Sequence, residues 1–118
     1  MMLQNNLTIP DDWFENYLSS LIGKFYKIIP IKENGEPSLN KYMESLQREL
    51  IGCKDLIALL ENDDLFLSLI FTLQYLIEND CEFKIIRSEI FKSINICKKL
   101  QAKYSVKFPR GEKNGRVG

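Results

Sequence analysis

The chain has 118 residues, with 16 basic and 16 acidic side chains, no histidine and three cysteines. This length is typical of one compact domain, and the 45% apolar content is too high for a chain that is disordered throughout. Without histidine, the sequence excludes Ser-His-Asp and Cys-His catalytic arrangements and histidine metal ligands. It also lacks the glycine-rich motifs that bind nucleotide phosphates.

The zero net charge hides an uneven distribution along the chain. Residues 1–83 contain six basic and fourteen acidic side chains, a net charge of −8. Residues 84–118 contain ten basic and two acidic side chains, a net charge of +8. An acidic body with a basic C-terminal third is typical of chains that bind nucleic acid, bind an acidic partner or self-associate.

The sequence carries no targeting signal that we can identify. The first six residues do not place a positive charge before an apolar run, as a secretory signal does. The most apolar stretch, residues 65–77, is shorter than the roughly 20 residues needed to span a bilayer. Cys53, Cys81 and Cys97 are widely spaced and odd in number, which is typical of reduced core thiols. We therefore expect a cytoplasmic protein without membrane contact.

The first helix is expected to begin near Thr8, because Thr8 can cap it and Pro10 suits a first turn. Pairs of apolar residues then recur every four residues from Trp13 to Tyr26, which predicts a broad helical stripe. Pro30 is expected to end whatever element precedes it. Residues 26–29 fit either the end of this helix or a short strand that reverses in the turn-rich loop 31–37.

A second helix is expected from Ser38, which can cap it. Apolar residues then alternate at spacings of four and three, which predicts a seam along one helix face. The residues of this seam are Leu39, Met43, Leu46, Leu50, Cys53, Ile57 and Leu60. The seam runs through Gly52 and so favours one continuous helix. The alternative is that Gly52 ends one helix and a second begins near Lys54.

Residues 65–77 predict a helix that is capped by Asn62 or Asp63 and is apolar on nearly every side, as a central buried helix would be. The last helix is expected after Ser88. Its buried stripe contains Ile86, Ile90, Ile94, Cys97, Leu100 and Tyr104. Residues 83–85 and 104–108 alternate in polarity and could instead form short strands.

These elements predict a mainly α fold, a compact bundle of four to five helices with at most a small two-stranded element. We expect residues 1–108 to form a single helical domain. Residues 109–118 are expected to form a flexible basic C-terminal tail, because they have little apolar surface to bury.

Two clusters of acidic residues could in principle hold a metal ion or act in acid–base catalysis. One contains Asp11, Asp12 and Glu15, and the other contains Glu61, Asp63 and Asp64. Both lie where helices begin, and acidic side chains are favoured there by the exposed backbone N–H groups. We therefore interpret them as helix caps. The sequence assigns no catalytic, cofactor-binding or metal-binding residue and predicts no enzyme.

The basic C-terminal third offers a candidate surface for nucleic acid or an acidic partner. Lys92, Lys99 and Lys103 fall on one face of the last helix, where they could follow a row of phosphates. Tyr104 or Phe108 could stack on a base. The whole candidate surface contains Lys92, Lys98, Lys99, Lys103, Lys107 and Arg110. The alternative is an ordinary solvated lysine face.

A second candidate surface is apolar, because the predicted stripes exceed what a small bundle must hide. Its candidate interface residues are Trp13, Tyr17, Met43, Leu46 and Leu50. The alternative is that all of them are core.

Our leading hypothesis is a non-enzymatic interaction module, an adaptor, inhibitor or assembly component that binds a protein partner or itself. It needs no cofactor or small-molecule substrate. The alternative function is a nucleic-acid-binding regulator that uses the basic helix and tail.

Overall fold

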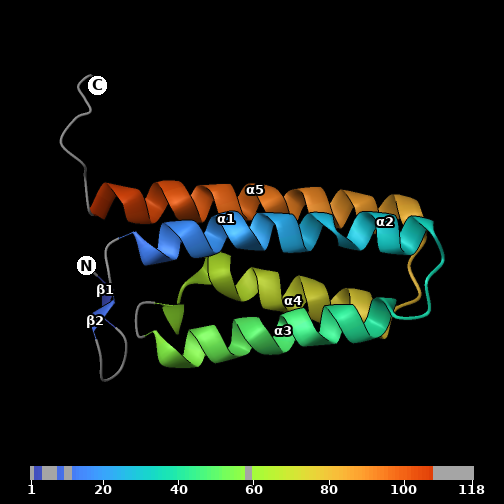
Figure 1. The fold of residues 1–118 in the computed structure, drawn as a ribbon, viewed down its shortest axis with the longest axis horizontal. Coiled ribbons are helices and arrows are strands. Elements are labelled where there is room, and N and C mark those ends of the chain that lie inside the picture. The colour runs from blue at the N-terminus through green and yellow to red at the C-terminus, as the bar shows by residue number, and fades with distance from the viewer. Residues whose placement is uncertain (1, 4–7, 10–11, 58–59, 108–118) are drawn as a thin grey trace, which may run out of the picture.

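A computed structural model of the protein describes residues 2–3, 8–9, 12–57 and 60–107 (Figure 1). The helices are α1 (Trp13–Tyr26), α2 (Ile28–Glu33), α3 (Leu39–Leu56), α4 (Asp64–Glu78) and α5 (Phe83–Lys107). They run up and down, with α1 and α2 forming one interrupted limb (Figure 1). Helix α5 packs on this limb and on α4, while α3 packs on α2 and α4. The predicted mainly helical bundle of four to five helices is confirmed.

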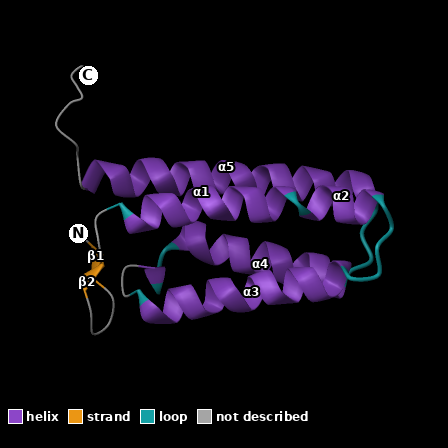
Figure 2. Ribbon diagram, in the orientation of Figure 1, coloured by secondary structure: helices purple, strands orange, loops and turns teal. Residues whose placement is uncertain are grey.

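Helix α1 begins later than the sequence suggested. Its first residue is Trp13, and its N-cap is Asp12, whose side chain makes no capping hydrogen bond. Thr8 instead belongs to β2 (Thr8–Ile9), which pairs antiparallel with β1 (Met2–Leu3) in a small ribbon at the N-terminus (Figure 2). The expected start at Thr8 is wrong, because the stripe that packs α1 into the core begins only at Phe14.

The break between α1 and α2 lies at Lys27, three residues before Pro30. Proline has no N–H to donate to the carbonyl four residues back, which here belongs to Tyr26, the last residue of α1. Pro30 itself lies in the first turn of α2, where a missing N–H costs little. We expected Pro30 to end the preceding element, but α1 ends four residues earlier, at Tyr26. The missing N–H of proline still accounts for the interruption.

The segments that could have been strands are helical. Residues 28 and 29 lie in α2, residues 83–85 in the first turn of α5, and residues 104–107 in its last turns. The buried stripe of α1 continues across Lys27 into Ile28 and Ile29, so helical packing outweighs the short alternation in polarity. Phe108 and residues 109–118, including the predicted tail, lie outside the described residues.

Helix α3 runs without interruption through Gly52, so the prediction of continuity is confirmed. A Cβ built on Gly52 would meet no atom within 4 Å among the described residues. Close packing therefore does not require a glycine at this position. The helix ends at Leu56, earlier than the seam suggested, because Ile57 has an extended backbone.

The composition of α4 predicted a helix buried on nearly every side, and this prediction is wrong. Phe66, Leu69 and Leu73 enter the core, but Phe71 is 66% exposed and Tyr75 is 50% exposed. A helix at one corner of a four-helix bundle can bury only the stripe that faces its neighbours. The surplus apolar residues of α4 therefore remain at the surface.

One carboxylate, that of Asp63, joins the start of α4 to the end of α5. Its Oδ1 accepts a hydrogen bond from the backbone N–H of Phe66 at 3.0 Å, so Asp63 is the one of the two predicted candidates that caps α4. Its Oδ2 accepts hydrogen bonds from Lys103 Nζ at 2.7 Å and from the Tyr104 hydroxyl at 2.6 Å. The side chain of Asp63 is only 1% exposed.

Burial of this carboxyl opposes its ionisation, but the hydrogen bonds from Lys103, Tyr104 and the Phe66 N–H outweigh that effect. The pKa of Asp63 is therefore held below its ordinary value of 3.8. The ionised carboxylate is the form that the folded chain favours.

We expect Asp63→Ala to lower the free energy of unfolding by about 2 kcal/mol. A lost N-cap accounts for about 1 kcal/mol, and the lost hydrogen bond from the Tyr104 hydroxyl to Asp63 for a similar amount. Urea denaturation measures the change. The matched control is Asp64→Ala, which removes an exposed acid from the same helical turn and should cost less than about 0.5 kcal/mol. Equal losses for the two variants would contradict the role of Asp63.

The lowered pKa of Asp63 also predicts how stability depends on pH. A carboxyl whose pKa is lower in the folded state contributes stability that is complete above its unfolded pKa and is lost as the pH falls through the folded pKa. The stability advantage of the wild type over Asp63→Asn should therefore shrink as the pH falls from neutral through the ordinary pKa of 3.8 and below it. Denaturation curves across this range test it, and an advantage that stays constant would contradict it.

Candidate interaction surfaces

Three of the five predicted interface residues are in the core. Met43, Leu46 and Leu50 are buried in the hydrophobic cluster between the helices. They cannot contact a partner in this fold, because the seam of α3 faces its neighbouring helices. Trp13 remains at the surface, and its ring stacks on that of Tyr17 with 5.2 Å between the centroids.

Tyr17 is partly buried and links α1 to α3. Its hydroxyl donates a hydrogen bond of 2.7 Å to Glu49 Oε2, and Lys24 Nζ lies 2.9 Å from both oxygens of the same carboxylate. Burial, followed by the Glu49 carboxylate, raises the pKa of Tyr17. This residue is therefore held in an internal network and offers little to a partner.

The predicted basic surface is only partly available. Lys103 is committed to Asp63, and Lys92 Nζ lies 3.2 Å from Glu89 Oε2 on the same helix. Lys98 and Lys99 are exposed. The side chain of Lys107 and the whole of Arg110 lie outside the described part of the chain.

Tyr104 cannot stack on a base, because it is buried. Its ring packs edge-on against Phe14, with 5.3 Å between the centroids. The suggestion that it contacts nucleic acid is therefore wrong.

A second row of residues on α5 was missed in the sequence. Lys84, Arg87, Phe91 and Lys98 follow one another at spacings of three, four and seven, which keeps them within an arc of about 60°. All four are exposed, and we call this row the basic–aromatic face of α5. The predicted helix start at Ser88 hid it, because Lys84 and Arg87 then fell outside the helix.

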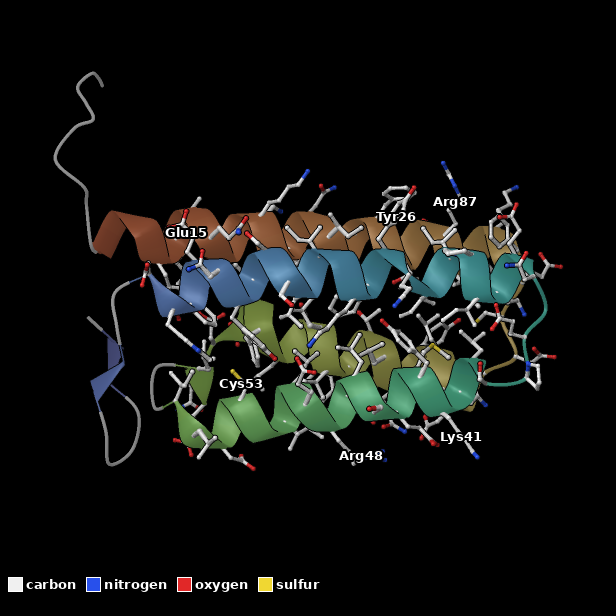
Figure 3. The ribbon with its side chains drawn as sticks, viewed as in Figure 1. Glu15, Tyr26, Lys41, Arg48, Cys53 and Arg87 are labelled. Atoms are coloured by element: carbon white, nitrogen blue, oxygen red, sulfur yellow. The ribbon has the colours of Figure 1, made fainter. Side chains whose placement is uncertain are left out.

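The middle of this face is an aromatic pair. The Phe91 ring meets the ring of Tyr26, from the end of α1, nearly edge-on with 6.3 Å between the centroids. The guanidinium carbon of Arg87 lies 4.8 Å from the centroid of Phe91. Tyr26 and Arg87 project from the same edge of the molecule (Figure 3). Cations and aromatic rings therefore share one exposed surface.

The outer face of α3 provides a contrast. Lys41 and Arg48 project from the opposite edge of the molecule (Figure 3). Glu44 and Asp55 fall on the same arc of α3, and all four residues are exposed. Charges of both signs alternate there, whereas the basic–aromatic face of α5 carries only positive charge.

The cysteines are core residues, as predicted, and all three are buried. Burial raises the pKa of Cys97 to about 12. Burial and the Glu49 carboxylate together raise the pKa of Cys53 to about 12, and the side chain of Cys53 points inward (Figure 3). Both thiols are therefore protonated at neutral pH and are poor nucleophiles.

Within the described ranges, no three acidic or cysteine side chains come together as a metal site would require. The same ranges contain no helix with the length and apolar character needed to cross a membrane. No family model, curated protein or solved structure matches this chain. Its function has to be argued from the placement of its own residues.

The raised thiol pKa values predict slow alkylation in the folded protein. At pH 8, a pKa of about 12 leaves a thiolate fraction of about 10⁻⁴. Cys53 and Cys97 should therefore react with iodoacetamide at least about 100-fold more slowly in buffer than in denaturing urea. Peptide mass spectrometry follows each site separately, and equal rates in the two conditions would contradict the prediction.

Proposed function

We propose that the protein is a non-enzymatic helical interaction module that binds a partner protein or a second copy of itself. The observation that carries this proposal is the exposed aromatic face of α4. Phe71 and Tyr75 lie one turn apart and at least half of each is exposed. Interface centres are enriched in aromatic residues and depleted in charge.

The sequence of α4 supports the same conclusion. It contains no charged residue between Asp64 and Glu78, so the exposed face has no charge to keep it in water. Leu67, one turn before Phe71, is partly buried and extends the same row. An adaptor, inhibitor or assembly component needs such a surface and needs no reactive group.

The orientation of α4 is fixed by contacts on its other sides. Asp63 caps its start, and the Gln47 amide of α3 donates hydrogen bonds to Gln74 Oε1 at 2.7 Å and to the Ile70 carbonyl at 3.4 Å. A face held in this way requires little ordering when a partner binds, which favours affinity.

We expect Phe71→Glu to abolish association while the helical circular dichroism spectrum stays unchanged. A charge at the centre of an apolar interface loses its hydration without gaining a partner. Light scattering measures self-association, and pull-down with tagged protein measures binding of other proteins.

The matched control for this experiment is Tyr26→Glu. It adds the same charge to a similarly exposed ring at the end of α1, twelve residues from Phe14, whose ring contacts Phe66 of α4. This variant should associate as the wild type does. A wild type that is strictly monomeric and retains no protein would contradict the proposal, as would full association by Phe71→Glu.

A second candidate function is a nucleic-acid-binding regulator. The basic–aromatic face of α5 favours this function, because a row of positive charges along a helix attracts a negatively charged phosphate backbone. Lys98 and Lys99 belong to the surface predicted for this role, and Lys84 and Arg87 extend it.

A further inference from the structure

We propose that the basic–aromatic face of α5 binds single-stranded nucleic acid, with Tyr26 as the ring on which a base stacks. This inference rests on the second candidate function and names its ligand and its site.

The charges of this face are available to a ligand. Within the described part of the chain, Lys84, Arg87 and Lys98 form no ion pair, whereas Lys24, Lys54, Lys92 and Lys103 each have an acidic partner. Positions 84 to 98 cover about 21 Å along the helix axis, at about 1.5 Å per residue. A polyanion laid along α5 would therefore meet three cations that have not already been neutralised.

The rings decide which polyanion fits. Tyr26 is 55% exposed and Phe91 is 37% exposed, so Tyr26 is the more accessible of the two aromatic residues. Phe91 supports Tyr26 from the side, and Arg87 covers the ring of Phe91. An exposed aromatic ring flanked by cations is the combination with which proteins bind unpaired bases.

The other anionic ligands use this face less well. In a duplex the base faces are stacked on each other, so Tyr26 would have no ring to contact. An acidic peptide brings carboxylates for the lysines but no row of planar rings. A single strand supplies both phosphates and accessible bases, and it matches all parts of the face.

The two helices that build the site are fixed relative to each other. Gln101 of α5 donates hydrogen bonds to the Glu15 carbonyl at 3.2 Å and to Ser19 Oγ at 2.9 Å, both on α1. Tyr26 and Phe91 pack together further along the same pair of helices. Binding therefore does not have to bring the ring and the cations together.

The test is fluorescence anisotropy of the full chain with labelled 15-nucleotide oligo(dT) and oligo(U). With three phosphate contacts on a single strand, log K should fall against log salt with a slope of about −2 or steeper. The double variant Lys84→Gln/Lys98→Gln should bind more weakly and make the slope shallower by about 1.4. Its matched control is Lys41→Gln/Arg48→Gln on the outer face of α3, which should change neither affinity nor slope.

The stacking role has its own variants. Tyr26→Leu should weaken binding about tenfold, with the salt slope unchanged because no charge is removed. Tyr26→Phe keeps the ring and should retain wild-type affinity. A 15-base-pair duplex should bind more weakly than the single strands, and poly-glutamate should not compete with them.

The outcomes separate the inference from the function on which it rests. No binding of either oligonucleotide at about 50 mM salt would overturn both. Binding that survives the Lys84/Lys98 and Tyr26→Leu changes would leave a nucleic-acid function but overturn this site. Loss in the lysine variant without loss in Tyr26→Leu, together with competition by poly-glutamate, would overturn the single-strand assignment in favour of an acidic protein partner.

Discussion

The arrangement of the bundle depends on the buried carboxylate of Asp63. It caps α4 through the Phe66 N–H and receives Lys103 and Tyr104 from the last turns of α5. A charge with 1% exposure is tolerated only when hydrogen bonds replace its hydration, and three donors provide them here. Because one residue contacts both the start of α4 and the end of α5, it adds to the core packing a specific contact that holds the two helices in register.

This contact also joins the two halves of the charge distribution. Asp63 belongs to the acidic body and Lys103 to the basic C-terminal third, so their ion pair crosses the boundary at Phe83. The basic–aromatic face of α5 is not neutralised in this way by the acidic body among the described residues. Folding therefore leaves positive charge on one edge of the molecule, although the net charge of the whole chain is zero.

Local rules predicted the elements whose signals are local. The cap at Asp63 and the continuity of α3 through Gly52 could be predicted, because a cap is a contact over three residues and the seam repeats over several turns. The start of α1 at Trp13 was missed, because Thr8 and Pro10 are good helix-start residues in isolation. Only the packing of the buried stripe, which begins at Phe14, shows that the helix starts later.

The candidate surfaces were harder to predict than the helices. Met43 and Phe71 look alike in sequence, since both are large apolar residues in helices, and only the positions of neighbouring helices decide which one is buried. The same holds for the cations. Lys103 is committed to a residue forty positions away, whereas the spacing of Lys84, Arg87 and Lys98 would have been visible had the helix start been placed at Phe83.

The two exposed faces lie on neighbouring helices and differ in chemistry. The face of α4 with Phe71 and Tyr75 is uncharged, so salt should affect binding there little, whereas the binding proposed for the face of α5 depends on charge and should be sensitive to salt. Since α4 and α5 each occupy one corner of the bundle, neither face has to be dismantled for the other to be used. Under the two proposals made above, the chain joins two ligands, and the Asp63 contact helps to hold the two faces at a fixed relative orientation.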